Sequence, residues 1–229
     1  MTKQVPRTGI EGFLENVQVA GLADVKQLTR AMSDYVGNPT DPKGAARHLI
    51  EKGVLTKFQA ERLLAGRTDI FHLGQYRLLE ELGRGGMGRV YKALHLTMGR
   101  IVALKVLAPE LTKTQRAREM FQREVRAAAK LNHPNIVTAF DANHHEDRFF
   151  LVMEYVDGPN LQQLVKERGP LAIAQACEFI KQVAQGLDCA HGHGLVHRDI
   201  KPANLLVQKN STGYQIKILD FGLAHIMAG

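Results

Sequence analysis

A glycine-rich segment with strand patterns on both sides is the feature that most restricts how this chain folds. Gly83-Arg84-Gly85-Gly86-Met87-Gly88 has the spacing G-x-G-x-x-G, in which backbone N–H groups can approach a polyphosphate because no Cβ blocks them. Alone, this spacing also fits a dinucleotide-binding turn, which opens a helix. Here Val90-Tyr91-Lys92-Ala93 follows and predicts a strand, as do residues 76–82 before it. We therefore expect a glycine-rich hairpin, which argues against the dinucleotide fold.

The next block places a lysine in an apolar strand. Val102-Ala103-Leu104-Lys105 would bury an ammonium group, which is costly unless a carboxylate or a phosphate faces it. Glu124 follows nineteen residues later, in the helical pattern of residues 116–131, and can supply the carboxylate. A surface lysine at a strand edge is the alternative, which the glycine-rich segment upstream disfavours. Residues 149–156 predict a buried strand leading into a linker whose backbone can pair with an adenine edge.

A short polar loop and the strand after it carry the groups suited to phosphoryl transfer. Within the loop, Asp199 can accept a proton from an attacking hydroxyl, and Lys201 can neutralise a transferring phosphoryl group. Asn204 can ligate a metal through its amide oxygen. A strand is expected at 216–219, and Asp220 after it offers a hard oxygen ligand for Mg²⁺.

Together these blocks resemble the protein kinase superfamily in order and spacing: G-x-G-x-x-G-x-V, V-A-[IL]-K, a helical glutamate, H-R-D-x-K-x-x-N and D-F-G. The forms Gly85-Gly86-Met87-Gly88 and His197-Arg198-Asp199-Ile200-Lys201-Pro202-Ala203-Asn204 are most similar to bacterial Hanks-type serine/threonine kinases, and the N-terminus resembles planctomycete-like ones. The resemblance implies an α+β fold after a small all-α module. An N-lobe of antiparallel sheet and αC helix would span about 76–156, and a partial helical C-lobe about 157–229.

The resemblance also implies ATP and Mg²⁺ as cofactors and assigns roles to residues. Lys105, paired with Glu124, would hold the α- and β-phosphates, Asp199 would be the catalytic base, Lys201 would contact the γ-phosphate, and Met153 would be the gatekeeper. Asn204 and Asp220 are the implied Mg²⁺ ligands. The implied ATP site comprises Leu82, Gly83, Arg84, Gly85, Gly86, Met87, Gly88, Val90, Ala103, Lys105, Glu124, Met153, Glu154, Val156 and Leu206.

Residues 1–70 predict a separate helical module with a weak internal repeat. Gly53 lies 32 residues after Gly21, and each glycine precedes an N-cap residue that is followed three positions later by glutamine. We expect two helical hairpins, then a linker at 66–69 and the partial kinase domain at 76–229. Whether the module binds a protein partner or only stabilises the chain stays open.

Composition excludes several other classes. The net charge of +7 comes without a run of basic residues or interleaved aromatics, so no nucleic-acid partner is expected. Cys177 and Cys189 lack metal-site spacing and indicate a reducing compartment. No stretch reaches the about 20 apolar residues of a membrane span, and no signal peptide is evident. A cytoplasmic location is expected, with a membrane anchor in a longer parent chain left open.

The resemblance stops shortly after Asp220-Phe221-Gly222, before the segments that dock a protein substrate in this family. We expect a serine/threonine protein kinase acting on protein hydroxyls, with phosphotransfer impaired in a chain that ends here. One alternative is an ATP-binding, pseudokinase-like module without phosphotransfer. Another is an interaction adaptor in which the helical module is the working part.

Overall fold

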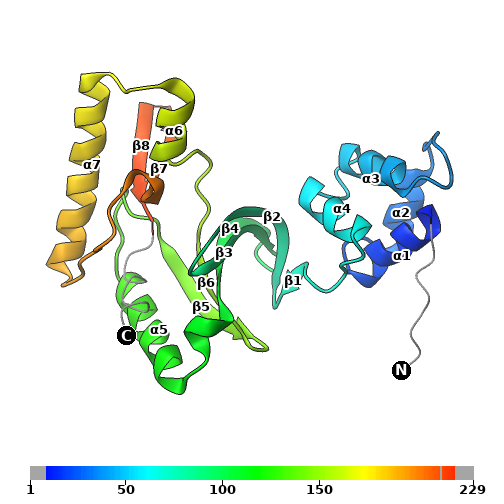
Figure 1. Ribbon diagram of the computed structural model, residues 1–229, viewed down its shortest axis with the longest axis horizontal. Coiled ribbons are helices and arrows are strands. Elements are labelled where there is room, and N and C mark those ends of the chain that lie inside the picture. Colours follow the sequence, from blue (N-terminus) through cyan, green and yellow to red (C-terminus); the bar gives the residue numbers. More distant parts are fainter. Residues whose placement is uncertain (1–8, 212, 220–229) are drawn as a thin grey trace. The chain divides into compact units, whose positions relative to one another are not determined.

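The computed structural model describes residues 9–211 and 213–219, which form two compact units. Of the described residues, those up to Leu82 and Tyr91–Arg100 form the first unit, and Gly83–Val90 and those from Ile101 onward form the second. Helices and strands follow the order shown in Figure 1. Their bounds are α1 Ile10–Val19, α2 Val25–Met32, α3 Pro42–Glu51, α4 Lys57–Leu64, β1 His72–Leu73, β2 Tyr76–Gly85, β3 Gly88–His95, β4 Arg100–Leu107, η1 Pro109–Thr112, α5 Gln115–Ala128, β5 Ala139–His145, β6 Arg148–Glu154, α6 Leu161–Arg168, α7 Ile173–Gly192, η2 Pro202–Asn204, β7 Leu205–Asn210 and β8 Gly213–Ile218.

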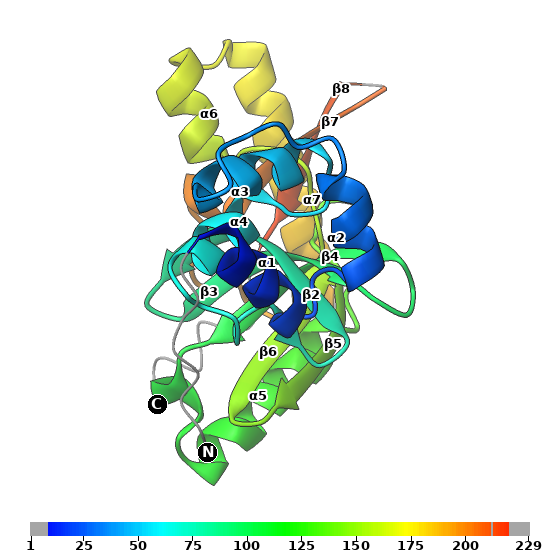
Figure 2. The same ribbon diagram turned by 90° about the vertical axis from the view of Figure 1, so that its right-hand side faces the viewer.

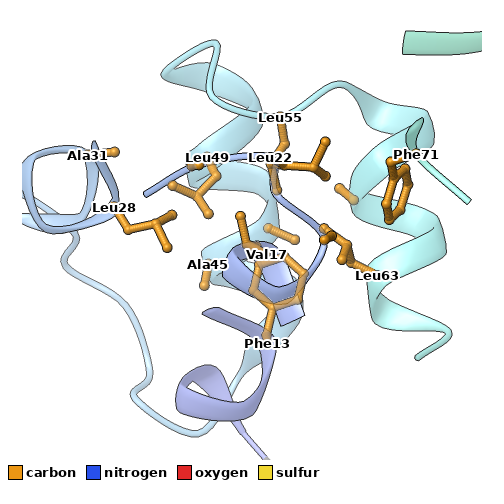
Figure 3. Close-up of a cluster of buried hydrophobic side chains, with 14 residues drawn as sticks. Phe13, Val17, Leu22, Leu28, Ala31, Ala45, Leu49, Leu55, Leu63 and Phe71 are labelled. Atoms are coloured by element: carbon orange, nitrogen blue, oxygen red, sulfur yellow. The ribbon is translucent and has the colours of Figure 1, made fainter. Parts of the chain in front are cut away.

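The N-terminal helices α1 to α4 pack around one apolar core. Figure 3 shows side chains from all four helices meeting there, with Val17, Leu49 and Phe71 fully buried. The repeat explains the chain reversals, because the turns at Gly21 and Gly53 have φ of +64° and +69°, which favour glycine. The predicted all-α module is therefore present, and its four helices cluster in both ribbon views (Figures 1 and 2).

Each repeat opens its second helix with a complete capping box. In α2, Asp24 and Gln27 exchange side chain–backbone hydrogen bonds, and in α4 Thr56 and Gln59 do the same. Both boxes follow the spacing that the sequence showed. They satisfy backbone N–H groups that a helix start otherwise leaves unpaired.

The second capping box also binds strand β2. Thr56 Oγ1 donates to the Leu79 carbonyl at 2.6 Å, and Gln59 Nε2 donates to the Leu78 carbonyl at 2.8 Å. One turn later, Arg62 forms an ion pair with Glu81 at 3.2 Å. Gln59 is only 2% exposed, so its amide bond is shielded from water. The helical module and β2 thus belong to one compact unit, and the expected boundary between residues 70 and 76 remains a prediction.

The second unit contains an antiparallel arrangement in which β6 pairs with both β4 and β5. Helix α5 lies beside β5 and sends Phe121 and Val125 into the apolar cluster under these strands (Figure 2). Further along the chain, β7 and β8 form a hairpin that packs with α6 and α7 around a second cluster. This confirms the α+β prediction of a sheet with one helix, followed by a helical part.

The link between α4 and β2 is testable by substitution. Gln59→Leu removes the amide that donates to the buried Leu78 carbonyl, and an unsatisfied buried acceptor costs about 1–3 kcal/mol. We expect a lower free energy of unfolding, measured by urea denaturation. Gln27→Leu is the matched control. It removes the equivalent capping side chain from α2, and among the described residues Gln27 makes no hydrogen bond to a carbonyl of β2. Equal losses from both variants would contradict a role for the β2 bond.

Candidate active site

The glycine-rich hairpin joins β2 to β3, and its glycines serve two purposes. Gly88 has φ of +132°, and a Cβ there would lie 2.0 Å from the Val106 carbonyl oxygen, so only glycine fits. Next to it, the Met87 carbonyl accepts a hydrogen bond from Ala108 N at 3.0 Å. By contrast, a Cβ on Gly83, Gly85 or Gly86 would meet no atom within 4 Å. Packing does not require glycine at these three positions, which suits a backbone that a ligand approaches closely.

Lys105 lies on β4 and is only 5% exposed. Its ammonium lies 3.5 Å from the sulfur of Met87, so the hairpin and the lysine meet. Glu124 is half-buried on α5, and among the described residues it forms no ion pair with Lys105. The structure thus brings Lys105 to the glycine-rich hairpin without forming the expected lysine–glutamate pair.

The apolar residues assigned to the adenine pocket belong to one cluster. Ala103 on β4 pairs with Met153 on β6, and both are buried with Val156. Val90 and Leu206 pack against the same cluster, as does Met87. Leu82 belongs to the first unit and is 42% exposed, while Arg84 is exposed on the hairpin.

Glu154, at the end of β6, is held by a partner that the sequence did not reveal. Lys217 on β8 is 8% exposed, and its ammonium lies 2.9 Å from the Glu154 carboxylate. The same carboxylate accepts from Thr138 N at 3.3 Å, and Glu154 N donates to the Thr138 carbonyl at 2.9 Å. These bonds fix the backbone where the strand passes into the linker. A buried lysine in the strand 216–219 was the available signal, because it requires an anion.

The polar loop before η2 gathers three of the predicted catalytic groups. Lys201 Nζ donates to the Asp199 carboxylate at 2.8 Å. Asn204 Nδ2 donates to the same carboxylate at 3.1 Å and to the Asp199 carbonyl at 2.8 Å. The structure therefore places the predicted phosphate contact and one predicted metal ligand within hydrogen-bonding distance of the predicted base.

These contacts keep Asp199 ionised. The hydrogen bond from Lys201 holds the pKa of the Asp199 carboxyl below its ordinary value, and the Asn204 amide adds to this effect, while partial desolvation opposes it. The carboxylate is therefore charged at neutral pH and can accept hydrogen bonds or a proton. Its contribution to stability is present above the ordinary pKa and is lost as the pH falls through the lowered one.

The residue directly after strand β8, Leu219, positions this loop. Leu219 N donates to the Asn204 carbonyl at 2.9 Å, and His197 Nε2 bonds to the Leu219 carbonyl at 2.6 Å. His197 is 2% exposed and accepts Asp199 N–H at Nδ1, so it orients the loop. Asp220, the other predicted metal ligand, lies outside the described residues.

Sequence reasoning also missed Asn135, which ties β8 to helix α7. Its amide donates to the Ile216 carbonyl at 2.8 Å and to Gln182 of α7 at 3.2 Å. Its carbonyl accepts from Ile218 N at 2.9 Å. A Cβ on Gly186 would lie 2.8 Å from Ile218, so the helix approaches the strand closely at this glycine. Local spacing could not reveal these contacts, because they join residues distant in sequence.

The Glu154–Lys217 pair predicts a stability effect. Lys217→Met leaves a mostly buried carboxylate without its ammonium, which costs about 1–3 kcal/mol. We expect a lower melting temperature, measured by thermal unfolding. Lys166→Met on the exposed face of α6 makes the same chemical change as a control. An unchanged melting temperature for Lys217→Met would show that the pair contributes little.

Comparison with known proteins agrees with this geometry. The protein kinase domain model matches residues 76–229. The chain is 42% identical over 155 residues to the probable serine/threonine-protein kinase PknB of Lactococcus lactis, covering 67% of this chain and 24% of that protein. It is 42% identical over 151 residues to serine/threonine-protein kinase PknD of Mycobacterium tuberculosis, covering 66% and 22%. The chain thus spans only a small part of these relatives.

Solved structures extend the likeness to the fold. The crystal structure of the M. tuberculosis PknI kinase domain matches with a TM-score of 0.59 and 35% identity, covering 66% of this chain and 61% of that domain. Among the described residues, no helix is both long and apolar enough to cross a membrane. From the matched domain and the catalytic loop, we conclude that this chain belongs to the protein kinase family, among relatives named as bacterial serine/threonine-protein kinases.

Proposed function

We propose that residues 76–229 bind Mg·ATP and supply the phosphotransfer residues of a serine/threonine protein kinase. The observation that carries this proposal is the loop in which Lys201 and Asn204 both bond to the Asp199 carboxylate. Three loop glycines that packing does not require support it. The family generally uses ATP and Mg²⁺, and the residues present fit both groups.

The fit is chemical as well as positional. The N–H groups of the 83–88 hairpin suit phosphate oxygens, and the buried ammonium of Lys105 next to Met87 suits the α- and β-phosphates. The cluster around Ala103 and Met153 suits a flat apolar ring, with the linker backbone after Glu154 as its polar edge. Asn204 would hold a metal through its amide oxygen, together with Asp220.

The loop residues then divide the chemistry of transfer. When bound, ATP supplies the phosphoryl group, and Mg²⁺ offsets part of the negative charge on the phosphates. Asp199 orients the attacking hydroxyl and accepts its proton, and its low pKa keeps it ionised for this role. Lys201, which lies beside the Asp199 carboxylate, would contact the phosphoryl oxygens, and catalysis would rely mainly on positioning and charge.

We further propose that the 229-residue chain alone transfers phosphate poorly to proteins. It spans 61% of the PknI kinase domain, and on α7 it exposes Ile173 by 82% and Ile180 by 61%. Such an apolar helix face suits burial in a complete domain. An ATP-binding module without transfer is the second candidate, favoured by the same observation.

Transfer is tested with radiolabelled Mg·ATP and a generic protein substrate. We expect little incorporation by the 229-residue chain. Strong incorporation that Asp199→Asn abolishes would contradict the impaired activity while supporting the assigned base. Incorporation unaffected by Asp199→Asn would point to a contaminating kinase and would not support the assignment.

ATP binding is the direct test of the nucleotide site. Lys105→Met removes the ammonium assigned to the phosphates, and we expect at least about tenfold weaker Mg·ATP binding by calorimetry, since hydrogen bonds to charged groups contribute about 1.5–3 kcal/mol. Lys92→Met on β3 is a control outside the assigned site. Equal affinity of wild type and Lys105→Met would overturn this role of Lys105.

The protonation of Asp199 gives a test that needs no nucleotide. Lys201→Met removes the main cause of its lowered pKa, so the pKa should rise towards the ordinary carboxyl value. A carbon-13 NMR titration of the aspartate carboxyl groups measures this. Lys209→Met, on the neighbouring hairpin, should leave the Asp199 pKa unchanged. A pKa that stays low without Lys201 would show that another group sets it.

A further inference from the structure

Two adjoining hollows lie in the first unit, and none of the residues assigned to ATP lines them. Their volumes are about 410 and 460 Å³, and both are lined by Leu22, Gln27 and Arg77. Volumes of this size are typical of small-molecule sites. Arg30 and Lys52 line one hollow and Asp24 lines the other. Three cationic side chains therefore face this space, against one carboxylate.

Arg77 is the decisive residue. Its Nε is buried and has no hydrogen-bond partner among the described residues. A buried guanidinium donor without a partner is rare in proteins, and a bound water or ion is a common partner for such a group. The pKa of His72 lies below its ordinary value. Burial is the larger cause, and the positive charge of Arg77 adds to it.

Two of the charged side chains near the hollows already have partners within the protein. Lys52 pairs with Asp34, which leaves Arg77 and Arg30 as the main positive groups. The Asp24 carboxylate accepts Gln27 N at 2.7 Å in the cap of α2, so it is occupied locally. Among the described residues, no hydrogen bond or ion pair joins Asp24 to Arg77, although both line the same hollow.

The internal repeat supplies a second donor. In the second repeat, Gln59 uses Oε1 in its capping box and donates its Nε2 to the Leu78 carbonyl. Gln27 uses Oε1 in its own capping box in the same way, at 3.0 Å from Asp24 N. Its Nε2 is then the equivalent donor, on the wall of both hollows, and it makes no bond to another described residue. In the second repeat the Leu78 carbonyl accepts from the Gln59 amide, whereas in the first repeat no described residue accepts from the Gln27 amide.

We propose that these hollows bind a small oxyanion, a phosphate or carboxylate group of a metabolite-sized molecule. Arg77 is its principal partner, Arg30 adds charge, and Gln27 donates through its amide. Guanidinium groups suit both oxyanions because their N–H donors form a fixed fork. The site involves none of the residues assigned to ATP, so it goes beyond the proposed kinase function.

The Nε–Hε signal of Arg77 in nitrogen-15 NMR tests this on the 229-residue chain. It is assigned by its loss in Arg77→Lys. We expect it to shift saturably on titration with inorganic phosphate, with succinate, or with both, and the more effective probe identifies the class of anion. A signal that neither probe shifts would overturn the proposal and leave bound water as the partner of Arg77.

Variants locate the site. Arg30→Ala changes only an exposed side chain, and it should weaken the binding measured at Arg77 about tenfold. Arg47→Ala, on the exposed face of α3, is the matched control and should leave binding unchanged. Lys105→Met should also leave it unchanged. Loss of the shift in Lys105→Met, or equal effects of the Arg30 and Arg47 variants, would contradict a site at these hollows.

Discussion

The catalytic loop depends on its attachment to strand β8. Leu219, the residue directly after β8, donates to the Asn204 carbonyl and accepts from His197, so both ends of the loop are fixed to one residue. Asn135 binds β8 through the Ile216 carbonyl, and Gly186 allows helix α7 to approach the same strand closely. The bonds of the loop backbone to Leu219 thus position the segment that carries Asp199, Lys201 and Asn204.

A second constraint acts at the other end of the site. Strand β2 leads directly into the glycine-rich hairpin, and helix α4 holds this strand through the carbonyls of Leu78 and Leu79. The side chains of a capping box normally bond only within their own helix. Here Thr56 and Gln59 also donate hydrogen bonds to carbonyls of β2. The helical module is thus part of the structure that presents β2, whatever partners it has.

The sequence predicted the features that depend on local spacing. Both capping boxes, the strands around the glycines and the polar loop follow from residues a few positions apart. The Lys217–Glu154 pair and the Gln59–Leu78 bond could not be predicted in this way, because their partners lie 63 and 19 residues apart and meet only after folding. The expected Lys105–Glu124 pair was inferred from a buried lysine and a helical glutamate nineteen residues later, and no such ion pair is seen among the described residues.

The central claim is that the glycine-rich hairpin, strand β4 and the polar loop form one nucleotide site. Hydrogen–deuterium exchange of the 229-residue chain, with and without Mg·ATP, tests it most directly. The account predicts slower exchange in residues 83–90, 102–106 and 197–207 together, and unchanged exchange in helices α1 to α3. Protection confined to one of these segments, or absent from all three, would contradict it.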